Sequence, residues 1–118
     1  PWNINVLAQI ITEQLLEDKA FISKTKKYIS KEREYLTKNL SRYDSIKIFP
    51  SVSNFLLLKI IKGKYNSPKL KNKLLTKGIL IRDCSNFRSL NNHYFRIAVN
   101  KRNENNLFLK LLNEILEK

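Results

Sequence analysis

The sequence is poor in the residues that mark several common classes of site. Its 118 residues include one cysteine, Cys84, and one histidine, His93. A single cysteine excludes an internal disulfide and a cysteine-based zinc site, and a single histidine argues against a histidine-rich metal site. We therefore expect no metal, and the sparse cysteine suits a reducing, cytoplasmic compartment.

Glycine and proline are also scarce, with two and three residues respectively. Flexible linkers, collagens and disordered tails need far more of them. No apolar run approaches the ~20 residues of a membrane span, and there is no basic-then-apolar leader. Because 42% of the residues are hydrophobic, we expect one globular domain that neither enters a membrane nor is secreted. The opening Pro1-Trp2-Asn3, without an initiator methionine, suggests a piece of a longer protein.

Positive charge is abundant. The formal net charge is +13, which is typical of a nucleic-acid-binding module. The basic residues are 17 lysines and 6 arginines, so most of the positive charge comes from lysine. The chain is also rich in asparagine and isoleucine, with 14 and 13 residues respectively. Lysine, asparagine and isoleucine share A/T-rich codons, so genome composition alone can produce this charge. The lysines are also spread along the chain without interleaved aromatics. The charge alone therefore gives only weak support to nucleic-acid binding.

The first third of the chain has the pattern of a helix. Apolar residues recur at steps of three and four from Asn3 to Tyr43, and this stretch contains neither glycine nor proline. One helix of about 40 residues would be ~60 Å long, which is too long for a compact domain of this size. We therefore predict two helices with a bend near Asp18-Lys19, the first capped by Asn3 or Asn5.

The remaining pattern alternates strands with helices. We predict strands at residues 46–49, 54–60, 79–82 and 94–99, a helix between Pro68 and Gly78, and a closing helix over residues 103–118. The order α, β, β, α, β, β, α predicts an α+β fold, a two-layer sandwich of a small antiparallel or mixed sheet with helices.

Arg96 is the most informative polar residue. It interrupts the apolar strand 94–99, where Phe95, Ile97 and Val99 share one face and Arg96 lies on the other. A shielded guanidinium needs an anion, and carboxylate or phosphate suits it best. The alternative is an arginine on a solvated sheet face. Arg82, at the end of the preceding strand, is open to the same two interpretations or to an ion pair with Asp83.

For two further candidates, Asn54 and Cys84, the sequence favours a structural role over a role in chemistry. Asn54 opens the second strand, where it either satisfies backbone groups or orients an arginine. Cys84 has no neighbouring histidine or lysine, which favours inert burial. The chain contains no glycine-rich phosphate loop, no Ser–His–Asp pattern and no metal-spaced carboxylates. We therefore expect no complete catalytic centre in this chain.

Four segments carry a resemblance to a known family: residues 1–9, 53–57, 77–83, and 94–99 followed by Glu104-Asn105. Together they resemble the C-terminal small domain of fold-type I, pyridoxal-phosphate-dependent aminotransferase-like enzymes. Histidinol-phosphate aminotransferases and threonine-phosphate decarboxylases share this layout. Residues 82–87, Leu90 and residues 94–96 look most like the decarboxylases of cobalamin biosynthesis. Arg88-Ser89 departs from the Pro-Gly or similar pair that is usual in that branch.

The resemblance implies roles for several residues. Arg96 matches the arginine that binds the substrate carboxylate, and Arg82 matches a second arginine for the carboxylate or phosphate end. Asn54, Asn86 and Tyr94 are expected to support them.

The resemblance also implies what the chain lacks. Pyridoxal phosphate and its Schiff-base lysine are expected on a large domain of the same polypeptide, which is expected to be a homodimer. Residues 1–20 are expected to form an interdomain helix with an exposed apolar patch, and the chain alone should bind no cofactor tightly and be inactive.

Overall fold

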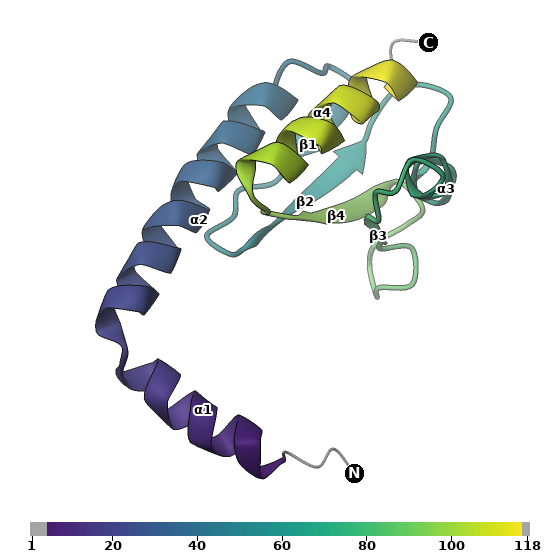
Figure 1. The fold of residues 1–118 in the computed structure, drawn as a ribbon. Helices are drawn as coiled ribbons and strands as arrows, with labels where there is room; N and C mark the ends of the chain where they lie inside the picture. The colour runs from purple at the N-terminus through teal and green to yellow at the C-terminus, as the bar shows by residue number, and fades with distance from the viewer. Residues whose placement is uncertain (1–4, 117–118) are drawn as a thin grey trace.

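The computed structural model describes residues 5–116, and within this range it confirms the α+β fold (Figure 1). Helices and strands alternate in the predicted order, and the strands form an antiparallel sheet with the order β1-β2-β4-β3. The elements are α1 (Val6–Glu17), α2 (Lys19–Leu40), β1 (Ile46–Ile48), β2 (Phe55–Ile60), α3 (Ser67–Leu75), β3 (Arg82–Asp83), β4 (Tyr94–Ala98) and α4 (Arg102–Leu116).

The long helical segment bends where the sequence predicts. Asp18 separates the first two helices, and its carboxylate accepts a hydrogen bond of 2.8 Å from the backbone N–H of Phe21. Asn5 caps the first helix by accepting from the N–H of Ala8 at 2.7 Å. The alternative cap, Asn3, lies outside the described residues. An Asp or Asn cap satisfies N–H groups that a helix start leaves free, so each helix begins independently.

The core lies between one face of the sheet and the helices α2, α3 and α4. Side chains alternate along β2 and β4, so every second residue points into this layer. The fully buried side chains include Leu36, Leu40, Leu56, Leu58, Leu70, Leu74, Phe95 and Leu112. No helix of the described chain covers the opposite face of the sheet, so the residues between the buried ones face an open surface.

The third strand is shorter than predicted. We expect it at residues 79–82, but β3 contains only Arg82 and Asp83. Gly78 has a positive φ of 80°, and the N–H of Ile79 donates to the carbonyl of Leu74 at 3.0 Å. This backbone still belongs to the cap of α3, so the chain reaches the sheet ladder later than its apolar pattern indicates.

Helix α1 lies apart from the core. It projects away from the sheet (Figure 1), and none of its residues is buried. Its exposed apolar side chains are Val6, Leu7, Ile10, Ile11, Leu15 and Leu16. The expected apolar patch is therefore present in this helix. No helix among the described residues has the length and hydropathy to cross a membrane.

Candidate functional site

The two predicted site arginines lie side by side on the open face of the sheet. Arg82 in β3 and Arg96 in β4 are direct cross-strand partners, and Arg96 is opposite Leu57 of β2. Side chains directly opposite each other in an antiparallel pair share a face. The structure therefore brings both arginine side chains to the same face of the sheet, on neighbouring strands.

Both arginines line an open pocket of about 430 Å³ at the β3 edge of the sheet. The full lining is Asn54, Phe55, Lys71, Leu80, Ile81, Arg82, Asp83, Arg96 and Ala98. Of the site residues that the sequence predicts, Asn54 also lies here, whereas Asn86 and Tyr94 do not.

The guanidinium groups rest on aromatic rings. The guanidinium carbon of Arg96, a half-buried residue, lies 4.5 Å from the centre of the Phe55 ring. Arg82 is more exposed: its guanidinium is 5.4 Å from the Phe87 ring, and its Nη2 donates to Oδ1 of Asn86 at 3.3 Å. Within residues 5–116, no carboxylate oxygen lies within 4 Å of either guanidinium. Ring contacts orient a cation but do not neutralise it, so both arginines keep their charge for an external anion.

Asp83 does not neutralise its neighbour Arg82. Its carboxylate accepts hydrogen bonds of 2.6 Å from the hydroxyls of Ser67 and Ser85. Burial raises the pKa of Asp83. The hydrogen bonds from Ser67 and Ser85 and the charge of Lys71 together lower it by more, so the net pKa lies below its usual value. The Arg82–Asp83 ion pair that we considered is therefore absent from the described residues. Alternation along a strand sends adjacent side chains to opposite faces and already indicates this result.

The three predicted supporting residues occupy different places. The side-chain oxygen of Asn86 accepts the hydrogen bond from Arg82 described above. The backbone carbonyl of Asn54 accepts from the N–H of Val99 at 2.8 Å, which ties the start of β2 to the end of β4. Tyr94 lies away from the pocket and stacks on Phe49 at 5.9 Å. Among the described residues, Asn86 is thus the one of the three that hydrogen-bonds to an arginine of the site.

Cys84 is buried, as its sequence context predicts. Burial raises the pKa of its thiol, and the charges of Arg96 and Arg82 only partly oppose that effect. A buried thiol with a raised pKa is a poor nucleophile. We therefore give Cys84 no chemical role.

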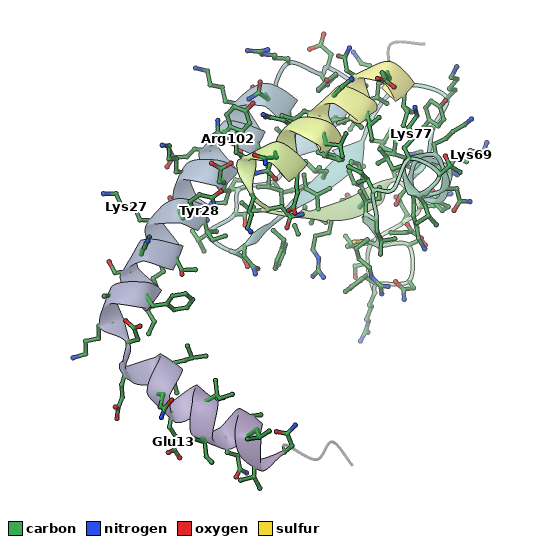
Figure 2. All side chains as sticks on the ribbon, viewed as in Figure 1. Glu13, Lys27, Tyr28, Lys69, Lys77 and Arg102 are labelled. Atoms are coloured by element: carbon green, nitrogen blue, oxygen red, sulfur yellow. The ribbon has the colours of Figure 1, made fainter. Side chains whose placement is uncertain are left out.

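Sequence reasoning missed a buried charge network behind the site. Glu32 of α2 is 3% exposed, and Nε and Nη2 of Arg102 donate to its carboxylate at 2.9 and 2.8 Å. Asn105 donates to the same carboxylate at 3.0 Å and to the carbonyl of Asn100 at 2.8 Å. Figure 2 shows Arg102 where the start of α4 meets α2. The network fixes the turn that follows β4, the strand that carries Arg96.

The hydrogen bond from Arg102 is the main reason why the pKa of Glu32 lies below its usual value, although burial opposes it. One signal in the sequence indicates such a group. Glu32 stands three residues after Ile29 and four before Leu36, on the apolar stripe of the helix. A carboxylate on that stripe must be buried with a partner.

The open face also carries aromatic rings beside lysines. Nζ of Lys47 lies 5.3 Å from the Phe49 ring, and Nζ of Lys59 lies 5.0 Å from the Tyr94 ring. Cations beside aromatics on an open antiparallel sheet are also what the nucleic-acid hypothesis predicts. This surface alone therefore does not discriminate between that hypothesis and a small anionic ligand.

Comparison with known proteins identifies the family of the chain. The family model described as "Aminotransferase class I and II" matches residues 1–110. A protein of Caldanaerobacter subterraneus named for threonine-phosphate decarboxylase is 38% identical over 117 residues, which are 99% of this chain and 31% of that protein.

Solved structures agree with this match. The histidinol-phosphate aminotransferase of Clostridium acetobutylicum has a TM-score of 0.87 and 31% identity, over 98% of this chain and 34% of its own. The L-threonine-O-3-phosphate decarboxylase of Porphyromonas gingivalis has a TM-score of 0.79 and 35% identity, over 100% of this chain and 36% of its own. The chain thus spans about a third of the length of these relatives, and it belongs to the aminotransferase class I and II family.

Proposed function

We propose that this chain is the small, substrate-binding domain of a threonine-phosphate decarboxylase-like enzyme. The observation that carries the proposal is the pair Arg82 and Arg96, which are cross-strand partners in one pocket without a carboxylate within 4 Å among the described residues. A substrate with two anionic ends matches two such cations. The similarity to proteins named for threonine-phosphate decarboxylase supports this choice of substrate class.

The two arginines have different tasks in this proposal. Arg96 lies in an inner strand of the sheet and stacks on Phe55, so its position is well defined, and we assign it to the substrate carboxylate. Arg82 lies in the short edge strand and is held by Asn86 and Phe87, so it can adjust to the phosphate end. Fixing both ends of the substrate sets the orientation of the bond that breaks, which is an effect of positioning.

Full-length enzymes of this family use pyridoxal phosphate. When bound, this cofactor supplies an electron sink for the reacting carbon. The residues that line the arginine pocket do not fit it. The carboxylate of the pocket, Asp83, is already bonded to Ser67 and Ser85, and its one lysine, Lys71, lies on a surface helix. We assign the cofactor to the large domain that we propose for the remainder of the polypeptide.

The same proposal gives a place to helix α1. Residues 1–20, of which residues 5–20 are described, would connect the two domains, and the large domain would cover the exposed apolar residues of α1. On this proposal the chain alone is inactive, and the complete enzyme is a cytoplasmic homodimer.

The alternative enzyme is a histidinol-phosphate aminotransferase, a name that several relatives carry. The two are separated by joining the chain to its large domain and supplying each substrate. Release of carbon dioxide from threonine phosphate supports the decarboxylase. Amino transfer from histidinol phosphate to 2-oxoglutarate supports the aminotransferase.

Arg96→Ala in that complete protein tests the site itself. Loss of a bidentate, charge-assisted contact of about 3 kcal/mol should lower kcat/KM about 100-fold. Arg88→Ala is the matched control, because Arg88 is exposed in the neighbouring loop and does not line the pocket. An unchanged kcat/KM for Arg96→Ala would refute the role of this arginine.

Nucleic-acid binding is the second candidate, because the open face carries aromatic rings beside lysines. A labelled single-stranded oligonucleotide titrated at low salt tests it. Binding that weakens steeply with salt would favour it. No binding at low salt would remove it.

A further inference from the structure

A third cation approaches the arginine pocket from outside the sheet. Lys71 of α3 lines the pocket together with Arg82 and Arg96, although its sequence context gives it no special mark. The helix packs beside β3, with Leu70 and Leu74 buried on its core side. Lys71 is half-buried, and within residues 5–116 no carboxylate oxygen lies within 4 Å of its ammonium group.

The formal charges of the pocket show what Lys71 adds. Its lining contains three cations, Lys71, Arg82 and Arg96, and one carboxylate, Asp83, which gives a net charge of +2. Without Lys71 the net charge would be +1. Asp83 is held by two hydroxyl donors, so it stays negative beside the pocket and disfavours excess anionic charge there unless a cation offsets it.

The chemistry of the two possible anions differs. A carboxylate carries one negative charge, whereas a phosphate monoester carries about −1.5 to −2 at pH 7. Arginine binds a planar anion through its fork, but lysine acts as a compact charge on a flexible stem and tolerates many geometries. A lysine on the Arg82 side of the pocket therefore suits the more highly charged and less planar end of the substrate.

We propose that Lys71 is a specificity-determining residue that, with Arg82, favours a doubly charged phosphate group over a singly charged group of the same shape. This proposal rests on the proposed function and extends it from the two arginines to a residue of α3. It explains why a lysine without an ion pair is kept half-buried beside two arginines.

The test compares two ligands that differ mainly in charge. O-phospho-L-threonine and O-sulfo-L-threonine, in which a singly charged sulfate ester replaces the phosphate, are titrated into the 118-residue chain at low ionic strength and pH 7.5, and binding is followed by NMR. Lys71→Gln should weaken binding of the phosphate ligand about 5- to 10-fold and of the sulfate ligand about 2-fold or less. Lys71→Arg should retain most of the preference.

Lys69→Gln is the matched control, because it removes the same charge from the same helix. Figure 2 shows Lys69 at the outer side of α3, and it does not line the pocket. It should leave both affinities unchanged. The dispersion of the amide resonances confirms that each variant is folded.

The outcomes separate this proposal from the one on which it rests. If the wild-type chain binds O-phospho-L-threonine and Arg96→Ala abolishes that binding, but Lys71→Gln weakens both ligands equally or neither, the role of Lys71 is overturned and the arginine site stands. If the wild-type chain binds neither ligand, or Arg96→Ala binds both as well as wild type, the arginine site fails and the role of Lys71 fails with it.

Discussion

Arg102 and the pair Arg82–Arg96 show two opposite environments for the same side chain. Arg102 has a buried carboxylate partner, Glu32, to which it donates three hydrogen bonds of 2.8 to 3.2 Å, and its guanidinium lies 3.5 Å from the centre of the Tyr35 ring. Arg82 and Arg96 also contact rings, but they are cross-strand neighbours on β3 and β4 without such a partner among the described residues. The first arrangement holds the fold together, whereas the second is what a ligand site requires.

The paired and the unpaired arginines should contribute differently to the stability of the fold. Like charges directly opposite each other on neighbouring strands destabilise a sheet. A cation paired with a buried carboxylate contributes to the fold mainly because removing either partner leaves the other uncompensated. Substitutions at the two places should therefore have very different effects on folding and on binding.

The largest effect on stability is expected at the paired site. Glu32→Gln removes the buried negative charge and leaves Arg102 without its partner, so the free energy of unfolding should fall by about 2 kcal/mol. Urea unfolding followed by circular dichroism measures this change. Glu34→Gln is the control, because Glu34 is exposed on the same helix and makes no ion pair with any residue between 5 and 116. Equal effects of the two substitutions would contradict the comparison.

The same network predicts a dependence on pH. Glu32 and Asp83 both have pKa values below their usual values in the folded chain. Groups with lowered pKa values stabilise the fold above the unfolded-state pKa, and that stabilisation is lost as pH falls through the folded-state pKa. The free energy of unfolding should therefore fall between about pH 5 and pH 3. Glu32→Gln should lose less free energy of unfolding than the wild type over this pH interval. Equal losses in the two proteins would argue against the role of Glu32 in the pH dependence.

The loop that supports Arg82 has a strained residue. Ser89 has a φ of 70°, a conformation that favours glycine. It belongs to the pair Arg88-Ser89, which stands where the decarboxylases that the sequence resembles usually have Pro-Gly or a similar pair. Ser89→Gly should raise the free energy of unfolding by about 0.5–1 kcal/mol. Gly78→Ala offers the opposite case: Gly78 has a φ of 80° and open space around it, so its substitution should lower stability by about 1 kcal/mol through the backbone alone. Thermal unfolding compares the two, and changes of the same sign would show that loop strain is not the cause.

The smallest effect on stability is expected at the unpaired site. Arg82→Ala loses a ring contact but also removes a like charge opposite Arg96, so the free energy of unfolding should change by less than about 0.5 kcal/mol. The same variant should bind O-phospho-L-threonine more weakly. A loss of stability as large as that of Glu32→Gln would mean that Arg82 is a structural residue.

The sequence predicts most of the fold, because the patterns involved are local. The bend at Asp18 follows from a capping residue, and the open and buried faces of β4 follow from alternation. The late start of β3 is not predictable in this way. Ile79 and Leu80 have the composition of a strand, but the backbone of Ile79 completes the cap of α3 and Leu80 is 71% exposed.

The site is predictable only in part for the same physical reason. Arg82 and Arg96 are visible because each ends or interrupts an apolar strand. The contributions of Ser67, Lys71 and Arg102 depend on where α3 and α4 pack on the sheet, and such contacts between distant segments leave no regular spacing in the sequence. The role of each arginine as a substrate ligand stays a prediction.

On the proposed function, the cross-strand partnership of Arg82 and Arg96 limits how the preference of this chain among anions can change. The separation of the two Cα atoms is a property of the hydrogen-bonded ladder, about 4.5–5.5 Å, and no side-chain substitution alters it. Ligands of different length must therefore be accommodated by the side-chain conformation of Arg82 and by the groups at the rim, above all Lys71 and the loop after β3, while the backbone positions of the two arginines remain constant.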